Sequence, residues 1–434
     1  MKKIIYIACI VLGASFQSTY AQNKVEDLSL SDAISITLKN NYDLTITKND
    51  EKIAQINNTW GNTGIVPSID LGITGQDIKT FNDDENYNSV SLKPQITLDW
   101  TLFDGFSARI NKANYVELQK RSEGNTALLV ENTIQDIILA YNNSLVQKSL
   151  MNVYKNMSDL SKDRMDKVKN KKDIGATTTY DYLLYKTSYL EDYANYLEQK
   201  VAYENSIRTL NYIMASEDNK EWNLITPLKA DTTSYDITSL LEKLKSNNQN
   251  LKNQYINQSI LALQSKSAKN SYYPSLKLNA GVNNFNQDIY YSGNTANANT
   301  KYNQMYAGLT LSWNIFNGGT RKRAVQIAKI NEESGDIEIK QMIHSLSNTL
   351  YQLYSSYNTY KAIYNLNVER LKAAALNLSI SKEKYDVGAI SSLDYRQIQQ
   401  TYLSAQVDKL QAAYNLIESK TNLLQITGSI VSNN

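Results

Sequence analysis

Side chains that could carry covalent or metal chemistry are scarce in this chain of 434 residues. It contains one histidine, His344, and one cysteine, Cys9. A nucleophile activated by a neighbouring base, and a zinc site built from His and Cys, each need several such residues close together. The sequence also has neither a G-x-S-x-G motif nor a phosphate-binding loop. It therefore predicts no enzyme, no metal site and no cofactor, and His344 is expected to pack or to face solvent within a helix.

Two aspartates that follow glycine-containing turns are the next residues of chemical interest. Asp181 lies six residues after Gly175, and Asp394 lies six residues after Gly388. Glycine commonly ends a helix because it adopts the left-handed backbone conformation without steric cost. A carboxylate at the start of the next helix is then stabilised by the helix dipole at roughly 0.3–1 kcal/mol. The residues alone thus give both aspartates a structural role at a helix start.

Both glycine–aspartate pairs belong to an internal duplication. Pro67-Ser68 recurs 207 residues later as Pro274-Ser275, and from Trp100, which matches Trp313, the offset is 213 to near the end of the chain. The change of offset predicts a six-residue insertion between Pro274 and Trp313. The predicted organisation is a first repeat at 22–214, a linker at 215–234, a second repeat at 235–429 and a tail at 430–434.

Each repeat is predicted to contain a helix, two strands and a hairpin of two long helices. No proline lies between residues 95 and 226 or after 274, and proline in a helix interior costs about 3 kcal/mol. Apolar residues spaced alternately by three and four run from Ile339 to Leu378, the pattern of a coiled-coil seam. A helix of 65 residues would be about 97 Å long. The hairpin tips are expected near 172–178 and 386–391.

Four segments alternate apolar and polar residues as strands do: about 68–79, 90–103, 275–285 and 303–316. Segments of about this length suit a transmembrane β-barrel, but a soluble sheet with one buried face gives the same alternation. Aromatic residues at the strand ends fit a membrane-interface girdle. They are Trp100, Phe103, Trp313 and Phe316.

The first 21 residues are predicted to be a secretory signal peptide. Lys2 and Lys3 precede an apolar run at 4–14, and Ala21 offers a small residue at the cleavage site. Without those two lysines, 43 of the 45 basic residues remain against 43 acidic ones, so no basic excess points to a nucleic-acid partner. No later apolar stretch approaches the roughly 20 residues of a membrane helix, so the mature chain is soluble or enters a membrane as a barrel.

The number of strands bears on assembly. Four strands cannot close a conducting barrel, and lipid tolerates no open sheet edge, so a membrane barrel must be shared between chains. Two chains would give eight strands, with an interior filled by side chains, whereas three would give twelve and an open duct.

The sequence resembles the TolC-like outer-membrane efflux family over nearly the whole mature chain. The resemblance rests on motifs that occur in the same order, several of them in both repeats. These are Leu28-Ser29-Leu30-Ser31-Asp32-Ala33, Ile65-Val66-Pro67-Ser68-Ile69, Trp100 to Gly105, Trp313 to Gly319, Ile174 to Thr177 and Tyr385 to Ala389. It implies an α+β membrane protein of the Gram-negative outer membrane, a homotrimer with a 12-stranded barrel in lipid and a helical tunnel in the periplasm. It also implies a passive efflux or type I-like secretion duct that docks a periplasmic adaptor and an inner-membrane pump.

The resemblance also implies a gate at the hairpin tips. Tyr385 matches a tyrosine that locks the closed tip, and Asp394 matches an acidic ring at the constriction, with Asp181 a weaker candidate in the first repeat. The arginine expected after the tip glycine is Ile390 here, so we expect a gate held by packing of Tyr385 and Ile390 more than by ion pairs, with Arg164 or Lys384 as the alternative lock. The adaptor would contact the tips at Ile174, Gly175, Ala176, Val387, Gly388 and Ala389.

Two other classes of exported protein contain long helices. A periplasmic adaptor would have a single helical hairpin within a β-rich chain, and a structural coiled-coil protein would lack the two strand pairs. The duplicated pattern of strands and helices favours the duct. The sequence does not indicate the transported substrate.

Overall fold

The structure is a computed structural model that describes residues 26–81, 86–292 and 296–431. The expected signal peptide, with Cys9, lies outside these residues. Each long helix and each strand of the four-stranded sheet in the first repeat has a counterpart in the second. The first repeat contains α2 (Leu30–Asn40), α3 (Tyr42–Asn57), β2 (Ser68–Thr80), β3 (Tyr87–Phe103), α4 (Ser107–Asp173) and α5 (Thr179–Ile213). The second contains α6 (Ile237–Asn247), α7 (Gln249–Asn270), β5 (Ser275–Tyr291), β6 (Ala298–Ser312), α8 (Thr320–Asp386) and α9 (Ser392–Ile426).

The duplication extends to element boundaries and to single hydrogen bonds. Helix α6 has the bounds of α2 shifted by 207 residues, and α8 and α9 have those of α4 and α5 shifted by 213. In the first repeat the Asn41 side chain donates to the carbonyl oxygen of Ile213 at 3.3 Å, and in the second Asn248 donates to that of Ile426 at 2.8 Å. The two repeats therefore fold by the same local interactions.

The compact units of the chain do not coincide with the two repeats. One unit combines the chain up to Asn41 with Thr133–Thr233 and Tyr357–Thr421, and the other combines Tyr42–Asn132, Ser234–Ser356 and the chain from Asn422. Helices α4 and α8 each have 67 residues, and each gives its first part to one unit and its second part to the other. A division at the linker, as the sequence suggested, would cut across both units.

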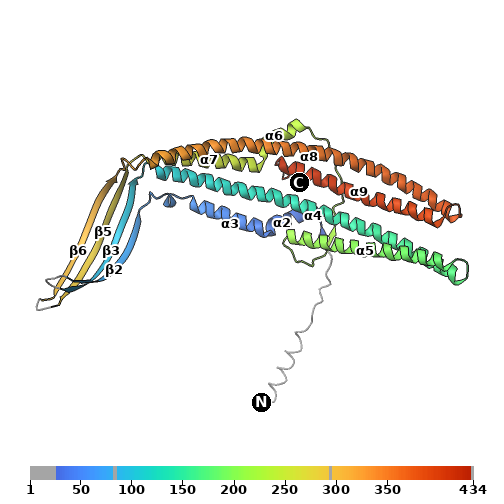
Figure 1. The fold of residues 1–434 in the computed structure, drawn as a ribbon, viewed down its shortest axis with the longest axis horizontal. Coiled ribbons are helices and arrows are strands. Elements are labelled where there is room, and N and C mark those ends of the chain that lie inside the picture. Colours follow the sequence, from blue (N-terminus) through green and yellow to red (C-terminus); the bar gives the residue numbers. More distant parts are fainter. Residues whose placement is uncertain (1–25, 82–85, 293–295, 432–434) are drawn as a thin grey trace, which may run out of the picture. The chain divides into compact units, whose positions relative to one another are not determined.

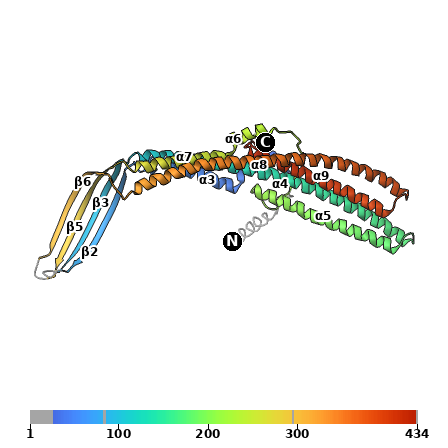
Figure 2. The same cartoon turned by 45° about the horizontal axis from the view of Figure 1, so that its top comes forward.

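The unit formed by Tyr42–Asn132, Ser234–Ser356 and the chain from Asn422 is called the sheet unit. It contains a four-stranded antiparallel sheet in the order β2-β3-β5-β6 (Figures 1 and 2). Strands β3 and β5 pair centrally, and β2 and β6 form the two edges. The strands differ from expectation at their ends. Strand β6 stops at Ser312, so Trp313 and Phe316 follow it, and β3 and β5 extend farther toward the hairpin turns, to Tyr87 and Tyr291.

The apolar face of this sheet is exposed, whereas polar side chains are sheltered only on the central strands β3 and β5. Leu71 on β2 is 74% exposed and Leu311 on β6 is 69% exposed, whereas Asn283 on the polar face of β5 is 4% exposed. A soluble sheet shows the reverse, because its apolar face packs on a core. The sequence left open a transmembrane barrel and a soluble sheet with one buried face. In the single chain the apolar side chains of the sheet are exposed rather than packed on a core.

The other unit, the hairpin unit, contains α2, α5, α9 and the second parts of α4 and α8. Its core includes Ile137, Tyr141 and Leu210, and the Tyr141 hydroxyl donates to the carbonyl oxygen of Leu28 at 2.8 Å. The segment 215–234, expected to be only a linker, contributes β4 (Trp222–Leu224), which pairs in parallel with β1 (Glu26–Leu28). The Trp222 indole is buried in the core and donates to Asn211 at 2.7 Å, which accounts for the order of this segment.

The predicted coiled-coil seam is sheltered, since every seam position from Ile339 to Leu378 is buried or half-buried and His344 beside it is exposed. Across the described ranges, none of the helices combines the length and apolarity that a transmembrane span requires.

Candidate functional site: the hairpin tips and the strand ends

Both helical hairpins turn through the glycines that the sequence marked. Gly175 and Gly388 have φ angles of 74° and 73°, the left-handed conformation that glycine adopts freely. The amide of Ala176 donates to the carbonyl of Lys171 at 2.7 Å, and that of Ala389 donates to Lys384 at 2.8 Å. These bonds close the last turn of each long helix. The tips expected to contact an adaptor are exposed, Ile174 by 81% and Val387 by 80%.

The two aspartates behind the tips cap the returning helices. Thr178 and Asp181 form a capping box, in which each side chain bonds to the backbone amide of the other. Hydrogen bonds from Thr178 and Thr177 hold the pKa of the Asp181 carboxyl below its usual value. In the second repeat the Asp394 amide donates to the Ser391 hydroxyl, which donates in turn to the Asp394 carboxylate at 2.7 Å. In the single chain both carboxylates thus have the structural role that their position predicts.

Tyr385 lies in an aromatic–cationic cluster to which four helices contribute. Its ring stacks on Tyr395 with centroids 4.9 Å apart, and its hydroxyl lies 3.4 Å from that of Tyr185. The Arg164 guanidinium lies 4.3 Å from the Tyr395 ring centroid and 5.7 Å from that of Tyr385. Burial, and then the contact with Tyr185, raise the pKa of Tyr385 to about 12, so its hydroxyl stays protonated at neutral pH.

This cluster revises the expected partners of Tyr385. The sequence paired it with Ile390 and, because an arginine is missing at that position, left it without an evident cation. In the structure Tyr385 packs on Tyr395, and a guanidinium reaches it from α4 instead. Arg164, which the sequence offered only as a lock separate from Tyr385, thus lies in the same cluster as Tyr385.

An ion pair that the sequence did not predict joins the two hairpins beside this cluster. Arg396 on α9 donates to both carboxylate oxygens of Asp192 on α5, each at 2.8 Å, and the Ser161 hydroxyl on α4 also donates to Asp192. The Asp192 side chain is 2% exposed and that of Arg396 is 18% exposed. A bidentate pair of this kind fixes both position and orientation. A small cavity of about 80 Å³ beside it is lined by Ser161, Arg164, Leu184, Tyr185, Ser188, Ser392, Leu393 and Arg396.

The aromatic residues expected at the membrane interface lie at one end of the sheet. The Trp100 indole donates to the carbonyl of Ile65 at 2.9 Å, and the Trp313 indole donates to that of Tyr272 at 3.1 Å. Phe103 meets Phe106 edge to face at 5.2 Å, whereas Phe316 is 83% exposed. These residues stand where the strands end and the long helices begin.

The chain with this geometry is similar to known outer-membrane proteins. Residues 240–429 match the family described as outer membrane efflux protein. Over 381 residues the chain is 20% identical to the outer membrane protein TolC of Escherichia coli strain K12, covering 84% of this chain and 75% of that protein. The second repeat thus matches the outer membrane efflux protein family, and most of the chain is similar to TolC.

Solved structures of outer-membrane channels share the fold of this chain. The CmeC outer membrane channel of Campylobacter jejuni has a TM-score of 0.75 at 18% identity, over 92% of this chain and 85% of that one. CusC, studied for its folding and transmembrane channel formation, has a TM-score of 0.76 at 12% identity, over 96% and 95%. These similarities support the outer-membrane location and the transport role that the sequence predicts.

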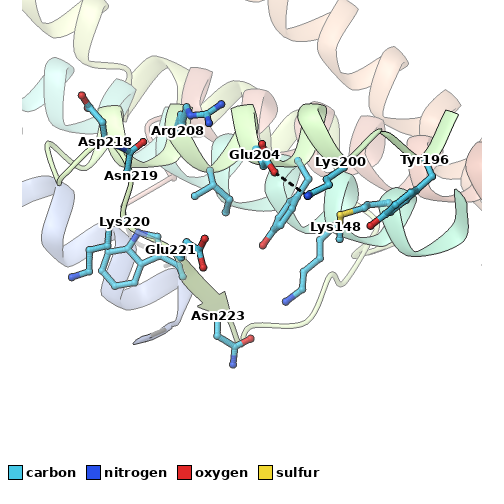
Figure 3. Close-up of a pocket in the computed structure, with 14 residues that line it drawn as sticks. Lys148, Tyr196, Lys200, Glu204, Arg208, Asp218, Asn219, Lys220, Glu221 and Asn223 are labelled. Carbon is cyan, nitrogen blue, oxygen red and sulfur yellow. Dashed lines mark ion pairs between the residues drawn. The ribbon is translucent and has the colours of Figure 1, made fainter. Parts of the chain in front are cut away.

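A sizeable cavity of the hairpin unit involves none of the residues singled out in the sequence. It measures about 800 Å³ and lies in the hairpin unit, beside α4, α5 and the segment 218–223 (Figure 3). Its lining mixes cations such as Lys148 with carboxylates such as Glu221, and Lys200 pairs with Glu204 at 3.9 Å. Among the described residues no group of three or more His, Cys, Asp or Glu side chains could hold a metal ion.

Proposed function

We propose that three copies of this chain form a passive duct, to which each contributes four strands in the outer membrane and two helical hairpins in the periplasm. The observation that carries this proposal is the exposed apolar face of the sheet, together with buried polar side chains on its central strands, such as Ser89 and Asn283. Lipid is the environment that such a face fits, because acyl chains make no demand for hydrogen bonds. The duct would work with a periplasmic adaptor and an inner-membrane pump, since nothing in its passive wall supplies energy.

The sheet edges support assembly from several chains. Within the described residues β2 and β6 each pair on one side only. In lipid, unpaired backbone groups cost several kcal/mol each, so both edges need a strand from another copy. The test is extraction of outer membranes in SDS without boiling. A trimer-sized band that becomes a monomer on heating supports the proposal, whereas a protein recovered only as monomer, or in the soluble periplasmic fraction, contradicts it.

We propose further that the hairpin tips gate the duct through the Tyr385 cluster. Tyr385→Ala removes the ring that stacks on Tyr395, so conductance in planar bilayers should increase. Tyr385→Phe keeps the stacking and loses only the 3.4 Å hydroxyl contact with Tyr185, so it should behave nearly as wild type. Equal conductance of all three proteins would place the gate elsewhere.

The carboxylate ring is a separate part of this proposal. Three copies of Asp394 near an axis would favour cations, in addition to the capping role seen in the single chain. Asp394→Asn keeps an acceptor for the cap but removes the charge, so cation selectivity should fall. Asp181→Asn is the matched control in the first repeat. If selectivity is unchanged in Asp394→Asn, the carboxylate is a helix cap only.

The exposed tips are the proposed adaptor contact. Ile174→Asp and Val387→Asp place a charge on each apolar tip without touching the cap residues. Co-purification of a periplasmic adaptor should be lost while the SDS-resistant trimer persists. An unchanged yield of adaptor would exclude these tips as its docking site.

A further inference from the structure

The sheet consists of two β-hairpins, β2–β3 and β5–β6, and the residue pairs of the first recur in the second. In the first, β2 and β3 pair Ser68 with Asp99 and Thr74 with Lys93. Adding 207 to each β2 residue and 213 to each β3 residue gives Ser275 with Ser312 and Gly281 with Tyr306. Both are observed pairs of β5 and β6. The offsets read from the sequence therefore preserve register within the sheet.

The pairing of β3 with β5 in the centre of the sheet joins the first β-hairpin to the second. Strand β3 pairs with β5 so that Leu98 lies opposite Ala280 and Trp100 lies opposite Leu278. Under the same offsets the edge strand β6 is the equivalent of β3, and the edge strand β2 is the equivalent of β5. The two edges of the sheet thus have the two sides of the same junction.

From this equivalence we propose that β6 pairs with β2 of the next copy in the register of the β3–β5 junction. Shifting the observed pairs places Leu311 opposite Ile73 and Trp313 opposite Leu71 of the neighbouring chain. This inference rests on the proposed shared assembly and specifies its partner, a second copy of this chain. All four residues lie on the apolar face, so the register continues that face across the junction, whereas a slip by one residue would place apolar side chains beside polar ones.

The turn after each hairpin gives independent support. Gly105 and Gly318 occupy equivalent turns with φ angles of 67° and 64°. A Cβ at Gly105 would lie 2.8 Å from the Cβ of Tyr273 and 2.9 Å from the carbonyl oxygen of Asn270, so the chain leading into β5 fills this turn. A Cβ at Gly318 would have no atom of the described residues within 4 Å, apart from Gly318 and its two chain neighbours. The second turn is thus open where the first is packed.

The correspondence between the two repeats also predicts which segment packs against the open turn at Gly318. The segment leading into β2, at 63–66, corresponds to Asn270–Tyr273, and its Val66 is 50% exposed. On the other side Phe316 is 83% exposed, whereas its counterpart Phe103 is half-buried. Pairing β6 with the next copy's β2 brings these exposed residues together. A contact between two different edges repeats head to tail and closes as a ring, as a duct requires.

Cysteine pairs in the full-length protein test the register in native outer membranes, because the sequence contains one cysteine, Cys9, within the expected signal peptide. Opposed residues on antiparallel strands have Cα atoms about 4.5–5.5 Å apart, within the range of a disulfide. Leu311→Cys with Ile73→Cys should therefore give covalent dimers and trimers on a non-reducing gel. In one chain these strands are about 14 Å apart, three strand spacings, so the bond cannot form internally. Leu98→Cys with Ala280→Cys is the in-chain positive control.

Two further pairs measure the register itself. Leu311→Cys combined with Leu71→Cys or with Gly75→Cys tests a slip of two residues in either direction, and both should link far less than the Ile73→Cys pair. Dominant linking by a slipped pair would overturn the register. Failure of every pair, with the positive control linked and the SDS-resistant trimer intact, would overturn the register while leaving the shared duct. Loss of the trimer in wild-type protein would overturn the duct as well.

Discussion

The buried ion pair between the two hairpins allows a prediction whose size follows from burial. Arg396→Leu would leave Asp192, 2% exposed, with only the Ser161 hydroxyl as its partner. Removing one member of a buried pair typically costs about 3–5 kcal/mol, because the remaining charge stays out of water. Asp192→Ala should cost less, since Arg396 is 18% exposed and can turn toward solvent.

The chain itself supplies the apolar replacement. The repeat offset matches Arg396 to Leu183 and Asp192 to Ala405, so the double variant Arg396→Leu with Asp192→Ala installs the residues of the equivalent positions. Replacing a buried pair by apolar residues is often neutral. The double variant should therefore be more stable than Arg396→Leu alone, although it contains one more substitution.

Hydrogen exchange of backbone amides in α5 and α9 measures these differences in purified protein. A loss of about 3 kcal/mol in local stability corresponds to roughly 150-fold faster exchange. The control is Arg370→Leu, which breaks the Arg370–Asp408 pair between α8 and α9, whose side chains are 50% and 42% exposed. An exposed pair contributes about 0–1 kcal/mol, so exchange should rise by less than about fivefold. Equal acceleration in Arg396→Leu and Arg370→Leu would refute the argument from burial.

Three further changes follow from other parts of the structure. Leu98→Arg places a charge on the exposed apolar face at a cost of about 2–4 kcal/mol and should reduce SDS-resistant trimer, whereas Thr97→Arg on the polar face should assemble. Asp231→Asn should lower thermal stability by less than about 1 kcal/mol at neutral pH, because the Asp231 pKa, lowered to about 2 by hydrogen bonds from Lys420 and Thr233, belongs to a partly exposed pair. Since this pKa lies below the unfolded value of 3.8, the difference from wild type should be constant above about pH 4 and fade toward pH 2. Trp222→Ala should cost about 3–5 kcal/mol, measured by thermal unfolding of the hairpin unit, since it empties a core position and leaves Asn211 without its indole donor.

Repetition made most of the fold accessible from sequence. The offsets of 207 and 213 locate α6, α8 and α9 to the residue, because capping side chains and turn glycines recur with them, as Thr178 and Ser391 do, whereas α7 runs six residues past the end that α3 predicts. Strand ends were less accessible. The alternating pattern runs through Trp313 to Ile315, but the pairing of β6 with β5 stops at Ser312, where the chain begins its turn into α8. Alternation reports side-chain direction and not the last hydrogen bond.

The segment 215–234 escaped prediction for a different reason. Strand β4 has three residues, too few for alternation to be recognised, and its partner β1 lies almost 200 residues earlier in the chain. What orders it is the burial of Trp222 and its hydrogen bond to Asn211. A short strand held by a distant partner is a tertiary effect that local patterns do not encode.

The contacts of Arg164, Asp192 and Arg396 depend on the packing of helices α4, α5, α8 and α9, which the sequence did not predict. The sequence nevertheless contains a signal for them. The duplication pairs Arg164 with Asn377, Asp192 with Ala405 and Arg396 with Leu183, so each charged residue has an uncharged counterpart. Where the fold only needs a cap or a turn, the repeats agree, as at Asp181 and Asp394. Where one repeat has a charge that the other lacks, the shared fold does not require that charge. At Arg164, Asp192 and Arg396 these departures from the internal repeat coincide with contacts between the two helical hairpins.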